Sequence, residues 1–397
     1  MTSYMNINQL FFLQILKDHM SRTKTDPIKG IDWKVVASYA SNHEVEGIVY
    51  FQCKDFMPRD MRALFQRKFS AALFHYKNIQ KEYTQLLQLF GNAGIKMFAV
   101  KGLEIANCYP MPALRTMGDL DIVVSKVDKE KAGHILEKKG YHTNEKVPDF
   151  DWHYHKGDTQ IELHHQLFYD EIVTQSKQKE FFNRFNGFAR HGKLDRSFHF
   201  VFLLAHLRKH IMNAGVGFRM FMDIDAAARN DQNLDWDWIE DKLEYLGMKD
   251  FSSICFALCE RWFGTRFVIE TKDLTDEFLK YSTDKIFGNG IFGLDDERNL
   301  KNVAINSILM YGKSRKCSRT ILIIKHIFPR YNHMRYLPQY IFIDGRPWLL
   351  PVAWGYRFIR FLTGKTNTAT HYLEKIAITD SQVDAREEEL KMWGLSK

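Results

Sequence analysis

Two aspartates one residue apart, Asp119 and Asp121, stand at the start of the apolar run DLDIVV. Side chains two apart on a strand share a face, so both carboxylates project the same way while Leu120 and Ile122 point to the other side. Carboxylates this close repel and raise each other's pKa unless a positive charge lies between them. A divalent cation removes the conflict, and carboxylates completed by water and phosphate are typical ligands of Mg²⁺. The pair indicates a magnesium site, although a single D-x-D triplet is also common at structural or solvated positions.

A third acid lies further along the chain. Glu162 is flanked by Ile161 and Leu163 in the apolar stretch QIELHHQL, so its carboxylate projects from the face opposite its two neighbours. A carboxylate there completes a three-acid site with Asp119 and Asp121. Such a site is far less common than an isolated D-x-D, and it favours metal-dependent phosphate chemistry.

Cationic and backbone groups suited to phosphate precede the aspartates. FAVKGLEIA places Lys101 and Gly102 where an apolar strand ends and a short helix begins. Backbone N–H groups at such a helix start suit phosphate, and glycine permits close approach. Arg115 adds a further cation beside the aspartates. We expect these residues to contact a nucleotide.

Four histidines surround the third acid. His164 is two residues after Glu162, shares its face, and is placed to orient the acid or to contact phosphate. His153 and His155 share one face of the preceding strand, and together with His164 and His165 they raise the possibility of zinc. No cysteine lies near them, and no second ligand pair has convincing spacing. Structural or substrate contacts are therefore the favoured interpretation.

The elements that must position these residues change character along the chain. Residues 95–170 predict a β-α-β-α-β-β unit, with strands at KMFAV, DLDIVV, WHYHK and TQIELHH, and with GD as a hairpin turn between the last two. Helical periodicity covers residues 6–20, 32–56 and 59–91 before this unit, and 197–215, 217–230, 235–247, 250–264 and 319–329 after it. The predicted fold class is α+β: a small mixed-sheet α/β core flanked by N-terminal helices and a larger C-terminal helical region. The predicted domains are 1–92, 93–175 and 176–397.

Bulk composition narrows the function class. The chain has 397 residues and a formal net charge of +8, which suits anionic ligands without choosing among them. Five scattered cysteines argue against a disulfide scaffold, and Cys255 and Cys259 are expected to be buried thiols on one helix. The N-terminus lacks a basic signal-peptide region, and no apolar stretch approaches the roughly 18 residues that span a bilayer. These features predict a cytoplasmic protein without a transmembrane segment.

The stretch RPWLLPVAWGYRFIRFLTG, residues 346–364, mixes aromatics, arginines and prolines. It fits a basic amphipathic helix for a membrane surface. It also fits a helix packed on the protein body with its arginine heads in water. The second interpretation is favoured, and both remain open.

In order and spacing, several of these pieces resemble an uncharacterised bacterial nucleotidyltransferase family of the DNA polymerase β-like superfamily. They are VKGLEIANCYP, RTMGDLDIVV, GY, IELHHQL, HLRKH, GFRMFMDIDAAA and RPWLLPVAWGYRF. The resemblance implies a magnesium-dependent, ATP-binding enzyme that transfers an NMP from an NTP to a hydroxyl and releases pyrophosphate. It implies two Mg²⁺ ions, with Mn²⁺ as a substitute, bridged by Asp119 and Asp121, and Glu162 holding the ion that activates the acceptor. Leu103 departs from the superfamily pattern, which has a small residue there.

The resemblance also extends the site into the later helices, to Lys209, His210, Arg219 and Asp223. The alternative for Arg219 and Asp223 is an ordinary i,i+4 ion pair, and packing is the favoured role of His206. The acceptor is open: a small molecule, a protein, a polysaccharide precursor or a nucleic acid. Two other functions compete: a catalytically silent module that binds a nucleotide or a partner, and a metal phosphohydrolase or phosphotransferase that uses the same acids.

Overall fold

The computed structural model describes residues 5–143, 146, 151–168, 180–182, 189–190, 193–213, 215–290, 296–310, 321, 324, 327–335, 337–363 and 378–395. Met1–Ile211, Gly215–Leu294 and Trp393–Leu395 form one compact unit, and Met212–Ala214, Asp295–Met392 and Ser396–Lys397 form a second. The division into residues 1–92, 93–175 and 176–397 stays a prediction. The helix predicted over 319–329 falls largely outside the described residues.

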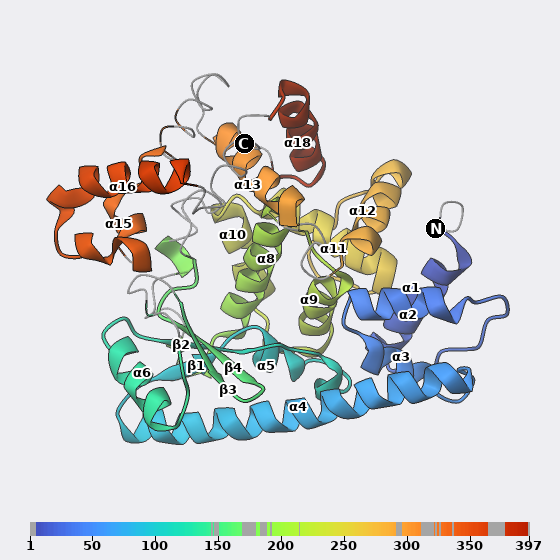
Figure 1. Ribbon diagram of the computed structural model, residues 1–397. Coiled ribbons are helices and arrows are strands. Elements are labelled where there is room, and N and C mark those ends of the chain that lie inside the picture. The colour runs from blue at the N-terminus through green and yellow to red at the C-terminus, as the bar shows by residue number, and fades with distance from the viewer. Residues whose placement is uncertain are drawn as a thin grey trace. The chain divides into compact units, whose positions relative to one another are not determined.

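Four helices open the first unit: α1 (Ile7–Met20), α2 (Trp33–Asn42), α3 (Glu46–Cys53) and α4 (Arg59–Asn92). The helical stretch expected over 32–56 is two helices, because Glu44 adopts φ 51°, a left-handed conformation that a helix does not tolerate. The 34-residue α4 contacts α3, and it also packs along β1 and α6 beside the sheet (Figure 1).

The sheet has four strands: β1 (Met97–Ala99), β2 (Leu120–Val124), β3 (Trp152–Lys156) and β4 (Thr159–His164). Their order is β1-β2-β4-β3, with β2 and β4 parallel and the other two pairs antiparallel. Between them lie α5 (Gly102–Ala106), the 3₁₀ turn η1 (Pro112–Leu114) and α6 (Lys129–Lys138). The predicted α+β class with a small mixed sheet is confirmed.

One face of this sheet is the hydrophobic core. Leu86 and Phe90 of α4 and Leu136 of α6 are buried with Ile122 of β2 in a single apolar cluster. The approach is close at α6, where a Cβ on Gly133 would lie 2.6 Å from the Tyr154 hydroxyl, so only glycine fits. The opposite face of the sheet is therefore left for polar side chains.

Five more helices follow: α8 (Arg196–Asn213), α9 (Phe218–Asn230), α10 (Trp236–Tyr245), α11 (Lys249–Phe263) and α12 (Asp276–Asn289). All of them belong to the first unit except the last two residues of α8. A two-residue pair of strands, β5 (Ala189–Arg190) and β6 (Lys193–Leu194), precedes them. Cys255 and Cys259 are buried free thiols of α11. α9 contacts α5, which brings the later helices to the turn that precedes β2.

The second unit contains α13 (Asp296–Met310), α15 (Tyr331–Met334), η3 (Pro338–Ile343), η4 (Pro347–Leu349), α16 (Leu350–Leu362) and α18 (Asp380–Met392). α13 and α18 share one small apolar core, and residues of α15, η3 and α16 form another. Among the described residues, no helix combines the length and apolarity that a membrane span requires.

Candidate active site

The parallel pairing of β2 with β4 aligns two of the acids. Asp121 is the register partner of Glu162, and Ile122 is the partner of Leu163. Ile122 and Leu163 are fully buried in the core. Because side chains alternate along a strand, Asp121 and Glu162 both project from the opposite, polar face. The pairing thus puts two carboxylates side by side on adjacent strands.

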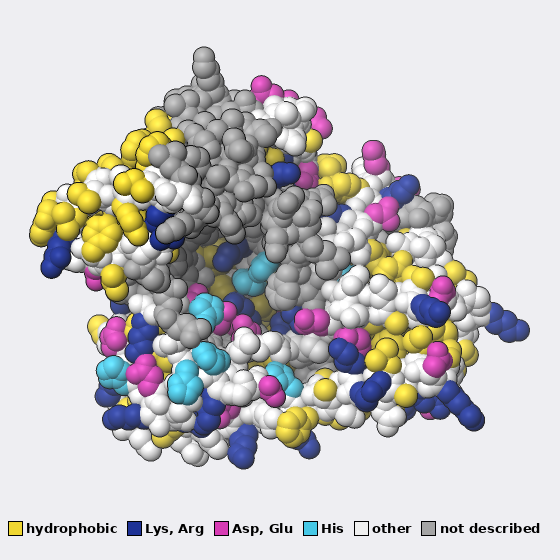
Figure 2. All heavy atoms as spheres, in the orientation of Figure 1, with side chains coloured by type: hydrophobic (Ala, Val, Ile, Leu, Met, Phe, Trp, Pro, Cys, Tyr) yellow, Lys and Arg dark blue, Asp and Glu magenta, His cyan; other side chains and the backbone are white. Residues whose placement is uncertain are grey.

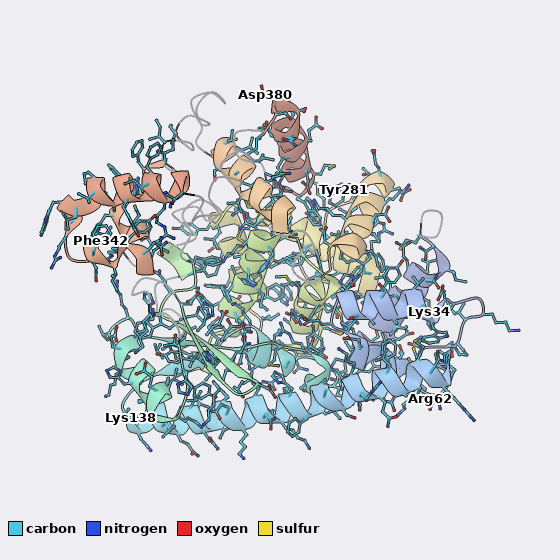
Figure 3. The ribbon with its side chains drawn as sticks, viewed as in Figure 1. Lys34, Arg62, Lys138, Tyr281, Phe342 and Asp380 are labelled. Atoms are coloured by element: carbon cyan, nitrogen blue, oxygen red, sulfur yellow. The ribbon has the colours of Figure 1, made fainter. Side chains whose placement is uncertain are left out.

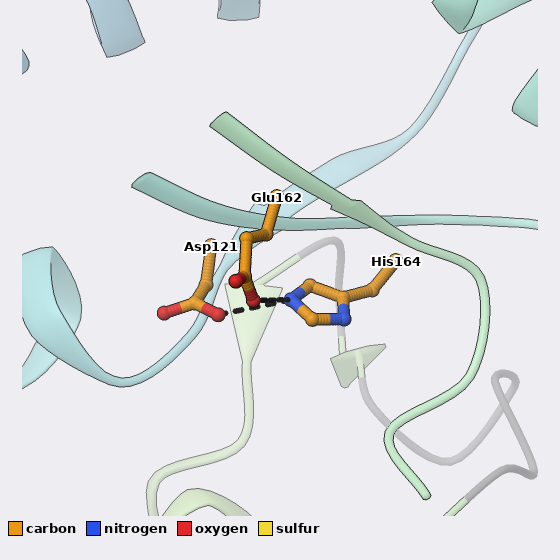
Figure 4. A group of neighbouring side chains, drawn as sticks. All are labelled: Asp121, Glu162 and His164. Atoms are coloured by element: carbon orange, nitrogen blue, oxygen red, sulfur yellow. Dashed lines mark hydrogen bonds and ion pairs between the residues drawn. The ribbon is translucent and has the colours of Figure 1, made fainter. Parts of the chain in front are cut away.

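His164 bridges these acids from the next outward position of β4. Its Nε2 lies 2.9 Å from Asp121 Oδ1 and 3.4 Å from Glu162 Oε2, as Figure 4 shows. Its Nδ1 lies 2.5 Å from Asp151 Oδ1. On the other side of Glu162, the ring of His153 in β3 approaches Oε1 at 3.3 Å. The imidazole of His164 is therefore enclosed by three carboxylates.

The turn after β1 carries the lysine of the site. Lys101 has φ 54° and ψ −121°, and its backbone N–H donates to His199 Nε2 of α8 at 2.9 Å. This conformation is rare for a residue with a side chain. It lets the Lys101 ammonium reach Asp121 Oδ1 at 2.7 Å. A Cβ on Gly102 would lie 3.1 Å from Nη1 of Arg115, so a side chain at this position would press on the guanidinium.

Asp119 lies one residue before β2, not in the strand. It is half-buried, and it lines the same cavity as Asp121 and Glu162. It shares a hydrogen bond with Glu162. Burial, followed by the negative charges of Asp121 and Glu162, raises the pKa of Asp119 to about 6. The three acids thus meet as one electrostatically linked group.

Charges in this group compensate one another. Burial opposes ionisation of Asp121, but the ammonium of Lys101 and the ring of His164 lower its pKa below the usual value. Burial likewise opposes ionisation of Glu162, and hydrogen bonds from His153 and His164 lower its pKa. Burial alone would lower the pKa of His164, yet its contacts with carboxylates raise it well above the usual value. Two carboxylates are therefore ionised and one imidazole is cationic.

These residues line a cavity of about 560 Å³ in the first unit. Figure 2 shows histidine and acidic side chains gathered over the strands of the sheet. The other wall comes from α8, which presents His206, Lys209 and His210 to the same space. His206 and His210 lie one helical turn apart, with Nε2 atoms 3.1 Å from each other. Burial lowers the pKa of both rings, that of His210 to about 3, so both are neutral at physiological pH.

Arg115 and Asp223 form a buried, two-pronged ion pair across the chain. Nε of Arg115 donates to Oδ1 of Asp223 at 3.1 Å, and Nη2 donates to Oδ2 at 2.7 Å. The Tyr109 hydroxyl donates to the same Oδ1 at 2.7 Å. The pair fixes the segment before β2 to α9, and both of its members line the cavity.

Arg219 has different partners from those that its spacing suggested. It contacts a carboxylate oxygen of Glu44 and donates to the carbonyl of Thr116 at 3.1 Å and to its hydroxyl at 3.0 Å. Asp223 is paired with Arg115. The i,i+4 pair of Arg219 with Asp223, one of the two alternatives for these residues, is thus replaced by contacts that reach far along the chain.

A family model described as an uncharacterised nucleotidyltransferase matches residues 29–264. This chain belongs to that nucleotidyltransferase family. The matched segment contains the whole sheet and α8 and α9, hence every residue placed in the cavity above. Comparison with curated proteins gave no match, and comparison with solved structures gave none.

The residues of this cavity fit a divalent cation. Asp121, Glu162 and His164 each offer a ligand atom within 4.8 Å of the others. Carboxylate oxygens are the hard ligands that Mg²⁺ and Mn²⁺ take. Lys101 and the cationic ring of His164 hold Asp121 by charge, which is the role that a metal ion would assume. The carboxylate donors of this set therefore suit a cation.

The sequence does not mark several residues that line the cavity or support it. No motif in the sequence marks Glu44 or Asp151 as a site residue. His199 is a buried residue of an apolar helix, and nothing local marks it as a partner of Lys101. Packing, the favoured role of His206, does not account for its position in the cavity lining. Its i,i+4 spacing from His210 was the available signal.

Proposed function

We propose that this chain is a polymerase β-like enzyme that transfers an NMP from an NTP to an acceptor hydroxyl and releases pyrophosphate. The observation that carries the proposal is the side-by-side placement of Asp121 and Glu162, joined by Asp119, in a cavity whose opposite wall carries Lys209. Membership of a nucleotidyltransferase family supports the transfer of a nucleotide. In this proposal residues 93–175 form the catalytic core.

The acids hold the metal side of the reaction. Mg²⁺, or Mn²⁺ in its place, supplies a lowered pKa for the acceptor hydroxyl and charge stabilisation on the attacking and leaving oxygens. Asp119 and Asp121 are assigned to two ions, and Glu162 to the ion beside the acceptor. His164 orients Asp121 and Glu162 from the side, and Asp151 fixes the imidazole through Nδ1.

The helical wall holds the phosphate side. Lys209 and the neutral ring of His210 face the acids across the cavity, where they can donate to the triphosphate. Lys101 pairs with Asp121, and its ammonium would be free to contact phosphate if Asp121 held a cation instead. Arg115, Arg219 and Asp223 are positioning residues, because their charges are already engaged with protein partners.

The proposed transfer needs no reactant besides the NTP and the acceptor. The acceptor oxygen forms a bond to the α-phosphorus, the bond from that phosphorus to the bridging oxygen breaks, and pyrophosphate carries the electron pair away. The hydroxyl proton passes to solvent water on the acceptor side, beside Glu162. The acceptor is a small molecule, a protein or a nucleic acid. We assign the enzyme to the cytoplasm because nucleoside triphosphates are available there.

The test has two parts. Calorimetry with each of the four ribonucleoside triphosphates, with Mg²⁺ or Mn²⁺, is expected to show metal-dependent binding of at least one. Cell extract incubated with the enzyme and that labelled nucleotide is then searched by mass spectrometry for the labelled acceptor, with Asp121→Asn as the control. Binding without labelling identifies a silent nucleotide-binding module, and release of inorganic phosphate identifies a hydrolase. No binding of any nucleotide contradicts the proposal.

A further inference from the structure

Residues 341–359 of the second unit carry large apolar side chains on their outside. Ile341 is 69 % exposed and Trp348 is 71 % exposed. Phe342, labelled in Figure 3, extends from the same short helix η3. Figure 2 shows hydrophobic side chains gathered over α15 and α16 with Lys or Arg at their margin. Single exposed apolar residues are ordinary, but a contiguous group on one lobe indicates a surface that is covered.

The exposure is not caused by the absence of a core. Tyr340, Ile343 and Ala353 are buried together, and Trp354 packs against them. The indole N–H of Trp354 also donates to the carbonyl of Pro329 at 2.9 Å. The lobe thus has an inside, and α16 has a fixed inner face.

The outer face of α16 is apolar throughout. Its exposed positions fall on one side of the helix: Pro351, Val352, Gly355, Tyr356, Phe358 and Ile359. The arginines of this helix, Arg357 and Arg360, belong to the half-buried side. A surface helix of a water-soluble body has the reverse arrangement. The outward face of α16 therefore matches an apolar environment and not water.

The charges of the surrounding residues indicate which environment covers this face. Residues 330–360 contain five arginines and one aspartate, Asp344. Arg330 and Arg346 are exposed, and the guanidinium of Arg360 lies 5.9 Å from the centre of the Tyr356 ring. Cations beside an apolar aromatic face complement anionic lipid headgroups over an acyl layer. Two copies of the same cationic face would repel each other.

We propose that residues 341–359 dock this protein on an anionic lipid surface. The apolar side chains of α16 enter the boundary between headgroups and acyl chains, Trp348 and Tyr356 lie at headgroup level, and the arginines meet the phosphates. This inference does not depend on the proposed function, since it rests on the second unit alone.

Flotation of the full-length chain with vesicles tests it. Binding is expected to vesicles of phosphatidylcholine mixed with phosphatidylglycerol, and weak binding to phosphatidylcholine alone. High salt is expected to weaken the binding, because the electrostatic part is screened. Fluorescence quenching by brominated lipid is expected, and Trp348→Phe is expected to reduce it.

Two variants separate the apolar part from the charged part. The double variant Phe358→Ser with Ile359→Ser is expected to lower affinity for the mixed vesicles by about tenfold or more, since two side chains leave the acyl boundary. Arg346→Glu is expected to lower the affinity for the mixed vesicles roughly tenfold and to leave binding to phosphatidylcholine vesicles unchanged. Val268→Ser removes an equally exposed apolar residue of the first unit and serves as the matched control, with no change expected. Unchanged thermal unfolding shows that the variants are folded.

Failure of the wild-type chain to bind the mixed vesicles overturns the proposal. So does equal binding by the double variant. A wild-type dimer that the double variant dissociates, without vesicle binding by either, would show that a second copy covers this face. Nucleotide binding by calorimetry is expected to be the same in all of these proteins, which separates this outcome from any failure of the proposed function.

Discussion

The two walls of the cavity in the first unit differ in the charge states of their side chains. On the sheet wall, Asp121 and Glu162 are ionised and His164 is cationic, because each has charged partners within hydrogen-bonding range. On the helical wall, His206 and His210 contact each other, and burial keeps both rings neutral. One wall is suited to holding cations, and the other to donating hydrogen bonds to an anion.

The largest effect is expected on the sheet wall. Asp121→Asn removes a charge that is central to metal binding, and the loss of one such electrostatic group should lower nucleotidyl transfer roughly a thousandfold. The labelled-nucleotide assay in cell extract measures it. Asp241→Asn, at an exposed position of α10, is the matched control and should leave transfer unchanged. Transfer that survives in Asp121→Asn would break the assignment of the sheet wall to catalysis.

The acids could be predicted from the sequence because the signal is local. Alternation along a strand puts Asp121 and Glu162 on the face opposite the apolar residues whatever the rest of the chain does. The same rule placed His164 beside Glu162. Strand pairing then brought the two strands together in register, which the sequence did not state.

The partners of the helical wall could not be predicted in this way. Arg219 and Asp223 are correctly spaced for an ion pair on α9, but Arg115 and Glu44 compete for them from distant parts of the chain. A two-pronged arginine contact is stronger than a flexible i,i+4 pair, so the distant partner prevails. Pairings of this kind depend on tertiary packing and leave no trace in local spacing.

The second prediction concerns the ion pair that ties the two walls together. Asp223→Asn leaves the buried guanidinium of Arg115 uncompensated, which should lower the free energy of unfolding by about 3 kcal/mol. Chemical denaturation measures it. Asp241→Asn breaks an exposed pair with Lys242 and should change stability by less than about 1 kcal/mol. Equal effects of the two substitutions would show that the Arg115 pair is not buried as described.

The third prediction uses the opposite shifts of two buried histidines. Burial lowers the pKa of His199 in the folded chain to about 3. Between this pKa and the unfolded pKa near 6.5, the unfolded chain binds one proton more than the folded chain. Its contribution to stability is full above pH 6.5 and falls with acid, by about 2 kcal/mol at pH 5. The pKa of His164 is raised, so its contribution is full below pH 6.5 and is lost as pH rises through the folded value.

Thermal unfolding across this pH range separates the two histidines. His199→Gln should flatten the acid side of the profile, and His164→Gln should flatten the alkaline side. His134→Gln, at an exposed position of α6, is the control and should leave both sides as they are. Flattening on the same side by both variants would contradict the opposite pKa shifts of His199 and His164.

The smallest effect is expected from a single cation of the helical wall. Lys209→Ala should weaken binding of a nucleoside triphosphate roughly tenfold, because one charge facing the phosphates is lost. Calorimetry measures it, with Lys242→Ala of α10 as the matched control. An unchanged affinity would move the triphosphate away from α8.

Binding of Mn²⁺ followed by electron paramagnetic resonance tests the central claim most directly. With a non-hydrolysable nucleoside triphosphate present, the wild-type chain is predicted to bind Mn²⁺ at the cavity, and Asp121→Asn and Glu162→Gln are predicted to lose that binding. Mn²⁺ binding that needs no nucleotide and survives both substitutions would contradict the account, as would no binding by the wild-type chain.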